Sequence, residues 1–114
     1  MHRITNLSYL KSISDNDENF MSDMITTFLE QTPELLAEMQ QLASQNNWPQ
    51  IGRTAHRMKP SFTFMGMNDG QRLIKDIEQY SQSVSNADQL LKLINMLSRE
   101  CEMAFNELRR KNIA

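Results

Sequence analysis

Residues 48–65 of this 114-residue chain read WPQIGRTAHRMKPSFTFM, and their pattern of apolar side chains decides the fold. Apolar residues recur there at steps of four and three, the spacing of a helix that packs one face against neighbouring helices. These residues are Ile51, Ala55, Met58, Phe62 and Met65. Asn47 is placed to cap the helix, and Pro49 suits its first turn. The stretch therefore predicts an amphipathic helix that is buried along one face.

The residues before this stretch predict two long helical segments and one short one. Residues 17–31 carry a wide apolar stripe at three- and four-residue spacing. Because Pro33 disfavours helical geometry at the residue before it, this helix should end or bend at Thr32. A further helix should begin at once, with Thr32 as its cap, and reach about Ala43. Residues 6–13 show a weaker periodicity, which predicts a short capping helix.

Two more helices are predicted after the stretch. The first should begin after Asn68 or Asp69 and run to about Ser83. Asn86 can cap the second, whose apolar residues again step by four and three as far as Leu108. At 1.5 Å per residue this last helix would be roughly 30 Å long.

All of the predicted elements are helices, and the connections between them are short. Only three glycines and three prolines are present, which favours a few long helices over many short strands. A chain of 114 residues fits one domain. We therefore expect an all-α fold, an antiparallel up-and-down four-helix bundle with a short N-terminal capping helix, in which residues 1–114 form a single domain.

Composition and charge exclude several classes of function. The net charge is −2, so no overall basic field would gather nucleic acid. No run approaches the roughly 20 apolar residues that span a bilayer, and the first residues lack the apolar core of a signal peptide. Two histidines and one cysteine make a zinc site hard to assemble, and the lone Cys101 favours burial in a reducing compartment. We expect a cytoplasmic protein without metal or membrane insertion, although a domain cut from a longer membrane receptor would look the same.

One polar flank of the helix over residues 48–65 carries residues suited to chemistry. If the apolar residues face the core, His56 lies on the solvent side, and Gly52, Lys59 and Thr63 share its flank. An exposed imidazole is a usable nucleophile near neutral pH. Lys59 brings an ammonium to where a phosphoryl group on His56 would lie. Gly52 leaves a low surface over which another protein could approach.

Positive charge surrounds this flank, because Arg53 and Arg57 lie beside His56. These arginines suit an acidic partner. Taken alone, the pattern also fits an ordinary solvated helix face, since an exposed histidine and a histidine–lysine pair three residues apart both occur often without a function.

The local sequence resembles the signature of histidine phosphotransfer domains. Residues 55–61 read AHRMKPS and are followed by Met65-Gly66, which is similar to the family pattern Ala-His-x-apolar-Lys-Gly/Pro-Ser with an apolar residue and glycine near ten positions after the histidine. Residues 28–39 and the Leu73…Ile77-Glu78 stretch also resemble the family. The resemblance covers residues 20–78 in detail, while the last helix matches only in character.

The resemblance implies a role for several residues. His56 would accept the phosphoryl group through Nε2, Lys59 would stabilise it, and Gly66 would end the helix or let a neighbouring element pass close. Many family members have glycine where this chain has Pro60, and a proline inside a helix costs ~3 kcal/mol or forces a kink. We predict a kink or local widening between His56 and Pro60, which is equally consistent with a purely structural bend.

The resemblance also implies the partners. A phosphocarrier of this kind accepts a phosphoryl group from the aspartate of a receiver domain and passes it to another, within a relay that includes a hybrid sensor kinase and a response regulator. The receiver would supply Mg²⁺, so we expect no cofactor on this chain. The chain has no glycine-rich phosphate loop, so we expect no ATP-dependent kinase activity. We expect a monomer that docks receivers through Gly52, Arg53, Arg57 and Thr63, next to the first or second helix.

Two other classes of function remain open. A helical adaptor could dock receivers without carrying phosphate, although the presence of both His56 and Lys59 argues against it. A bundle enzyme with a metal or redox centre is disfavoured, because the chain lacks the paired carboxylate–histidine motifs that such bundles place on facing helices.

Overall fold

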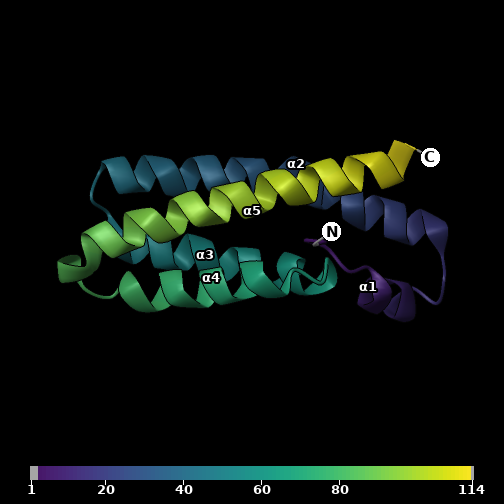
Figure 1. The fold of residues 1–114 in the computed structure, drawn as a ribbon, viewed down its shortest axis with the longest axis horizontal. Coiled ribbons are helices and arrows are strands. Elements are labelled where there is room, and N and C mark those ends of the chain that lie inside the picture. Colours follow the sequence, from purple (N-terminus) through teal and green to yellow (C-terminus); the bar gives the residue numbers. More distant parts are fainter. Residues whose placement is uncertain (1–2, 114) are drawn as a thin grey trace.

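The computed structural model describes residues 3–113, and all of its elements are helices (Figure 1). They are α1 (Ser8–Ile13), α2 (Glu18–Ser44), α3 (Trp48–Phe64), α4 (Asn68–Tyr80), a short 3₁₀ turn (Val84–Asn86) and α5 (Ala87–Ile113). The predicted all-α fold is confirmed, and residues 3–113 contain no strand.

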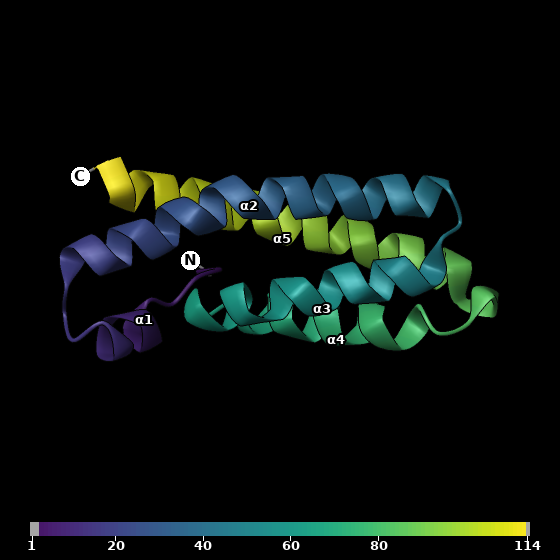
Figure 2. The ribbon, with the colours of Figure 1, turned by 180° about the vertical axis from the view of Figure 1, so that it is seen from behind.

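The four long helices lie side by side and bury one continuous apolar core. In Figures 1 and 2, consecutive long helices run in opposite directions, and α1 lies near the start of α2. α3 packs between α2 and α4, while α5 contacts both α2 and α4. Phe28 of α2 joins the layers, because its ring meets Phe62 and Phe105 edge-on at centroid distances of 5.9 and 5.7 Å. All five apolar residues that predicted the face of α3 are buried.

The helix end that was expected at Thr32 is not found in α2. The helix continues through Pro33 to Ser44, so Thr32 is not a cap but a buried residue inside it. Burial of apolar side chains on both sides of the proline, including Phe28 and Leu36, offsets the hydrogen bond that proline cannot donate. Figure 2 shows the axis of α2 changing direction in its N-terminal half, so the alternative expectation of a bend describes it.

α3 also contains a proline in its interior. Pro60 lies inside the helix, which keeps α-helical geometry from Trp48 to Phe64. The local widening that was predicted as one outcome between His56 and Pro60 is therefore not found. Gly66 follows α3 with a φ of 62°, in the left-handed region that glycine adopts readily. A Cβ there would lie 2.1 Å from the carbonyl oxygen of Asn6, so glycine also lets the N-terminal segment pass close.

The N-terminal segment is fastened to the bundle by a carboxylate of α5. Glu107 accepts hydrogen bonds from the backbone N–H groups of Ile4 and Thr5, at 2.7 and 3.0 Å, and from Thr5 Oγ1 at 2.8 Å. The N–H of Asn6 donates to the carbonyl of Met65 at 2.9 Å, and Leu10 of α1 is fully buried. α1 is therefore held against the bundle rather than hanging from it.

Two smaller findings bear on the class of the protein. None of the helices within residues 3–113 is both long and apolar enough to cross a bilayer. Cys101 is buried as predicted, and its burial raises the pKa of the thiol to about 12. A thiol with such a pKa is a packing group and not a nucleophile.

Candidate functional site

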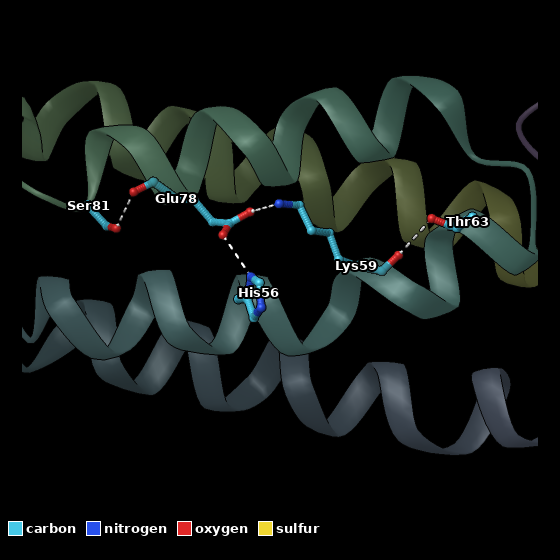
Figure 3. A network of polar contacts seen from close by, with 5 residues as sticks. All are labelled: His56, Lys59, Thr63, Glu78 and Ser81. Carbon is cyan, nitrogen blue, oxygen red and sulfur yellow. Dashed lines mark hydrogen bonds and ion pairs between the residues drawn. The ribbon is translucent and has the colours of Figure 1, made fainter.

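His56 projects from the middle of α3 into solvent (Figure 3). Its side chain is 70% exposed, whereas its neighbour Ala55 is completely buried. The buried face of α3 produces this arrangement, because a residue 100° from the apolar seam turns outward. A side chain with this exposure can be reached by a partner molecule and can exchange protons with water.

Glu78 of α4 holds one ring nitrogen of His56. The carboxylate Oε2 lies 3.1 Å from Nδ1, and Figure 3 shows the other ring nitrogen turned away from Glu78. An ionised carboxylate only accepts hydrogen bonds, so this contact places a proton on Nδ1. In the neutral ring, Nε2 then carries the lone pair and faces solvent. The contact with Glu78 therefore favours the tautomer in which the outward nitrogen is unprotonated.

Lys59 reaches the same carboxylate from one turn further along α3. Its Nζ lies 2.8 Å from Glu78 Oε1, and Figure 3 shows both side chains converging on Glu78. Glu78 is only 24% exposed, so its ion pair is sheltered more than a surface pair. The ammonium lies beside His56, as the spacing predicts, but in this state it is paired with Glu78.

The charges around Glu78 keep it ionised. Partial burial raises the pKa of the Glu78 carboxyl. Hydrogen bonds from Lys59 and His56, together with the positive charge of Lys59 and that of His56 when its ring is protonated, lower the pKa by more. The net pKa lies below the ordinary value of a glutamate. Glu78 is thus negative at neutral pH and fixes both neighbours by charge-assisted contacts.

Gly52 lies one turn before His56 and faces α4. A Cβ on Gly52 would come within 2.4 Å of Ser81 Oγ, and that hydroxyl donates to the carbonyl of Glu78 at 2.9 Å. The missing side chain therefore lets α3 and α4 approach closely beside the residue that holds His56. Gly52 also lines a shallow open hollow next to the imidazole. The lining of this hollow consists of Pro49, Gly52, Arg53, His56, Arg57, Glu78, Ser81 and Gln82.

The other residues expected to dock a partner point in different directions. Arg57 forms an ion pair with Glu38 of α2, whose carboxylate also accepts from Thr54 Oγ1 at 2.8 Å. Arg53 is exposed and makes no ion pair within residues 3–113. Thr63 is exposed, but its hydroxyl donates back to the carbonyl of Lys59 at 3.3 Å. The structure thus brings His56 and Lys59 together at one carboxylate and spreads the expected docking residues along both sides of α3.

Glu78 was not among the site residues identified from the sequence. It appeared only as part of the Ile77-Glu78 match, with no role assigned. Its place beside the apolar stripe of α4 was readable, but the register of α4 against α3 was not, because that register depends on the turn between the helices. Within residues 3–113, no group of three or more histidine, cysteine or acidic side chains is arranged to hold a metal ion.

Comparison with known proteins identifies the family. A search of curated proteins and of solved structures gave no significant match. A family model, described as the Hpt domain, matches residues 23–110, which is well over half of the chain and includes His56, Lys59 and Glu78. With an exposed histidine on a bundle helix and an ammonium beside it, the chain belongs to the Hpt domain family, whose members carry phosphoryl groups on histidine in phosphorelays.

Proposed function

We propose that the chain accepts a phosphoryl group on Nε2 of His56 from the aspartate of one receiver domain and transfers it to the aspartate of another. The observation that carries this proposal is the contact between Glu78 and Nδ1 of His56, which leaves the outward Nε2 with its lone pair. A nucleophile must be both unprotonated and accessible, and in the neutral ring Nε2 is the exposed nitrogen without a proton.

The proposed transfer needs no reactant beyond His56 and the acyl phosphate of the receiver. The Nε2 lone pair attacks phosphorus, an N–P bond forms, and the acyl-phosphate O–P bond breaks so that the receiver's aspartate leaves as a carboxylate. The second transfer reverses these roles with another aspartate. Because charge on the phosphoryl oxygens must be stabilised during transfer, catalysis depends on positioned positive groups.

Lys59 is the group on this chain that can supply that charge. Its ammonium is 43% exposed and lies one turn from His56, so a small rotation would move it from Glu78 to a phosphoryl oxygen. Glu78 would keep its hydrogen bond to Nδ1 and would stabilise the positive charge that the ring acquires when Nε2 is phosphorylated. Mg²⁺ belongs to the receiver in this proposal, and ATP takes no part.

The finer description of the carrier is also part of the proposal. Short turns, helices packed in chain order and alternating directions support an antiparallel up-and-down bundle in α2 to α5. We propose that the carrier is a cytoplasmic monomer that serves a hybrid sensor kinase and a response regulator. The buried, unreactive Cys101 is compatible with a reducing compartment.

Labelling from a phosphorylated receiver tests the proposal. Receiver domains from the same genome, each carrying radiolabelled phosphate, are mixed with the wild-type chain and with two variants, His56→Gln and His2→Gln. We expect acid-labile, base-stable label on the wild type and on His2→Gln, and none on His56→Gln. Absence of label on the wild type with every receiver would favour the adaptor that docks receivers without carrying phosphate. Label on His56→Gln would move the site elsewhere.

A second measurement tests the role of Lys59. Lys59→Ala should slow transfer at saturating receiver by about tenfold, the equivalent of one charge-assisted hydrogen bond of about 1.4 kcal/mol. Stability should change little, because the side chain is nearly half exposed. Lys75→Ala, which removes an exposed lysine from α4, is the matched control. An unchanged rate in Lys59→Ala would remove Lys59 from the mechanism.

A further inference from the structure

His56 divides the exposed surface of α3 into two flanks. Lys59 and Gly52 lie on the α4 side, where they meet Glu78 and Ser81. A second row of residues lies roughly 40–100° to the other side of His56 around the helix axis. This row consists of Arg53, Arg57, Pro60 and Phe64. The ion pair between Arg57 and Glu38 shows that the row faces α2.

The row ends at an aromatic pair that joins α3 to α1. The rings of Tyr9 and Phe64 are stacked, with centroids 6.1 Å apart and planes inclined by 17°. Tyr9 is 49% exposed, and Ile13, one turn further along α1, is also exposed. α1 buries Leu10 against the bundle and turns apolar side chains outward as well. We call Arg53, Arg57, Pro60, Phe64 and Tyr9 the α2-side ridge.

The aromatic end of the ridge is fixed in place. Glu107 binds the backbone of Ile4 and Thr5, and Asn6 is hydrogen-bonded to Met65 at the end of α3. A surface ordered in this way loses little conformational entropy when a partner binds. The matched part of the family begins at residue 23, so α1 lies outside it. The exposed ring of Tyr9 is therefore a feature of this chain beyond the part that the family comparison covers.

The ridge lies within the area that a partner of His56 must cover. Phe64 follows His56 by eight residues, or about 12 Å along the helix axis. A specific interface of standard size covers ~800 Å² on each partner, which reaches well beyond that distance. Aromatic side chains are frequent anchors at such interfaces, and rim arginines steer acidic partners. One end of the ridge is apolar and the other is basic.

We propose that the receiver that exchanges phosphate with His56 docks along the α2-side ridge, with the Tyr9–Phe64 pair as its apolar anchor and Arg53 facing an acidic group of the receiver. This inference rests on the proposed function and adds the docking direction. It assigns α1 a role in partner selection. The flank toward α4 is left to the contacts of Glu78 and Lys59.

A binding experiment with one exposed ring removed tests this docking direction. Tyr9→Ala should raise the dissociation constant for the receiver about tenfold, as expected for an interface anchor. Tyr9→Phe keeps the ring stack and should stay within about twofold of the wild type. Met103→Ala on α5 is the matched control, because Met103 is 45% exposed and α5 contributes no residue to the ridge. Its affinity should be unchanged.

Transfer kinetics separate docking from chemistry. In Tyr9→Ala, transfer should slow at limiting receiver and recover at saturating receiver, because His56, Lys59 and Glu78 are untouched. Phosphoramidate, a small donor that releases ammonia, should label His56 equally in the wild type and in Tyr9→Ala. Equal receiver affinity of Tyr9→Ala and the wild type would overturn the docking direction, while transfer to His56 would still stand.

Two further outcomes are distinguishable from these. If no receiver labels the wild type, the proposed function fails and this inference falls with it. If light scattering shows a wild-type dimer that Tyr9→Ala converts to a monomer, the ridge binds a second copy of the chain and the receiver assignment is wrong. Ile13→Ser tests whether Tyr9→Ala weakens binding only by detaching α1 from the bundle. It alters the outer face of α1 but keeps the Tyr9 ring that stacks on Phe64. It should weaken receiver binding about threefold, and wild-type affinity in both variants contradicts the inference.

Discussion

Glu78 and Glu107 are two partly buried carboxylates with opposite kinds of partner. Glu107 accepts hydrogen bonds from two backbone N–H groups and one hydroxyl, all in the N-terminal segment. Glu78 meets the ends of two exposed side chains, His56 and Lys59. Backbone donors cannot leave without unfolding the segment, whereas exposed side-chain donors can rotate away. The same group is therefore a structural clamp at one end of the molecule and an exchangeable contact at the other.

The largest expected effect is a difference in stability between variants of Glu107 and variants of Glu78. Glu107→Ala leaves the buried donors of Ile4 and Thr5 without a partner, so the free energy of unfolding should fall by about 2 kcal/mol. Glu78→Ala should cost less than about 1 kcal/mol, because water can solvate the freed His56 and Lys59. Urea denaturation of both variants measures the difference. Equal losses would mean that the Glu78 contacts are structural as well.

Phosphotransfer should show the reverse order. Glu78→Ala removes the acceptor that places the proton on Nδ1 of His56, so the rate at saturating receiver should fall about tenfold. Glu107→Ala should leave the rate of the folded fraction unchanged, since it is clamped to the N-terminal segment. Rapid-quench measurements with one phosphorylated receiver give both rates. A normal rate in Glu78→Ala would show that the tautomer is set by another means.

A third variant tests the close approach of helices that supports Glu78. Gly52→Ala places a Cβ 2.4 Å from Ser81 Oγ, so the hydroxyl must rotate and give up its bond to the carbonyl of Glu78. We expect a loss of about 1 kcal/mol. In the Ser81→Ala background, Gly52→Ala should cost little more, because the hydroxyl is already absent and Cβ of Ser81 lies at an ordinary 3.4 Å. Thermal unfolding of the single and double variants checks this, and additive losses would contradict it.

The smallest expected effect is the change in the free energy of unfolding as the pH falls. For both Glu78 and Glu107, partial burial raises the pKa of the carboxyl, but hydrogen bonds and nearby positive charge lower it by more, so the folded pKa lies below the ordinary value of 4.5. Each therefore contributes stability that is fully present above that pH and is lost as pH falls through the folded pKa. Glu107→Gln should flatten the acid limb of the unfolding curve more than Glu78→Gln. The opposite order would reverse the roles assigned here.

Much of the fold followed from the sequence alone because helix periodicity is local. All five residues of the predicted seam of α3 are buried, and the same rotation predicted the exposure of His56. Thr54 and Trp48 are buried as well, and the seam did not include them. The end predicted at Thr32 was wrong, because the preference of a residue before proline is also local, whereas burial along the whole of α2 is not. Tertiary packing outweighs a local preference of a few kcal/mol.

The sequence by itself determined which residues form helices, which faces are buried and that His56 and Lys59 share a flank of α3. Only the tertiary structure decided that both meet at Glu78, that Gly52 faces Ser81 and that Tyr9 stacks on Phe64. The reason is physical. Spacing within a helix is set by its 3.6-residue turn, but contacts between helices depend on the turns and packing that set their relative register.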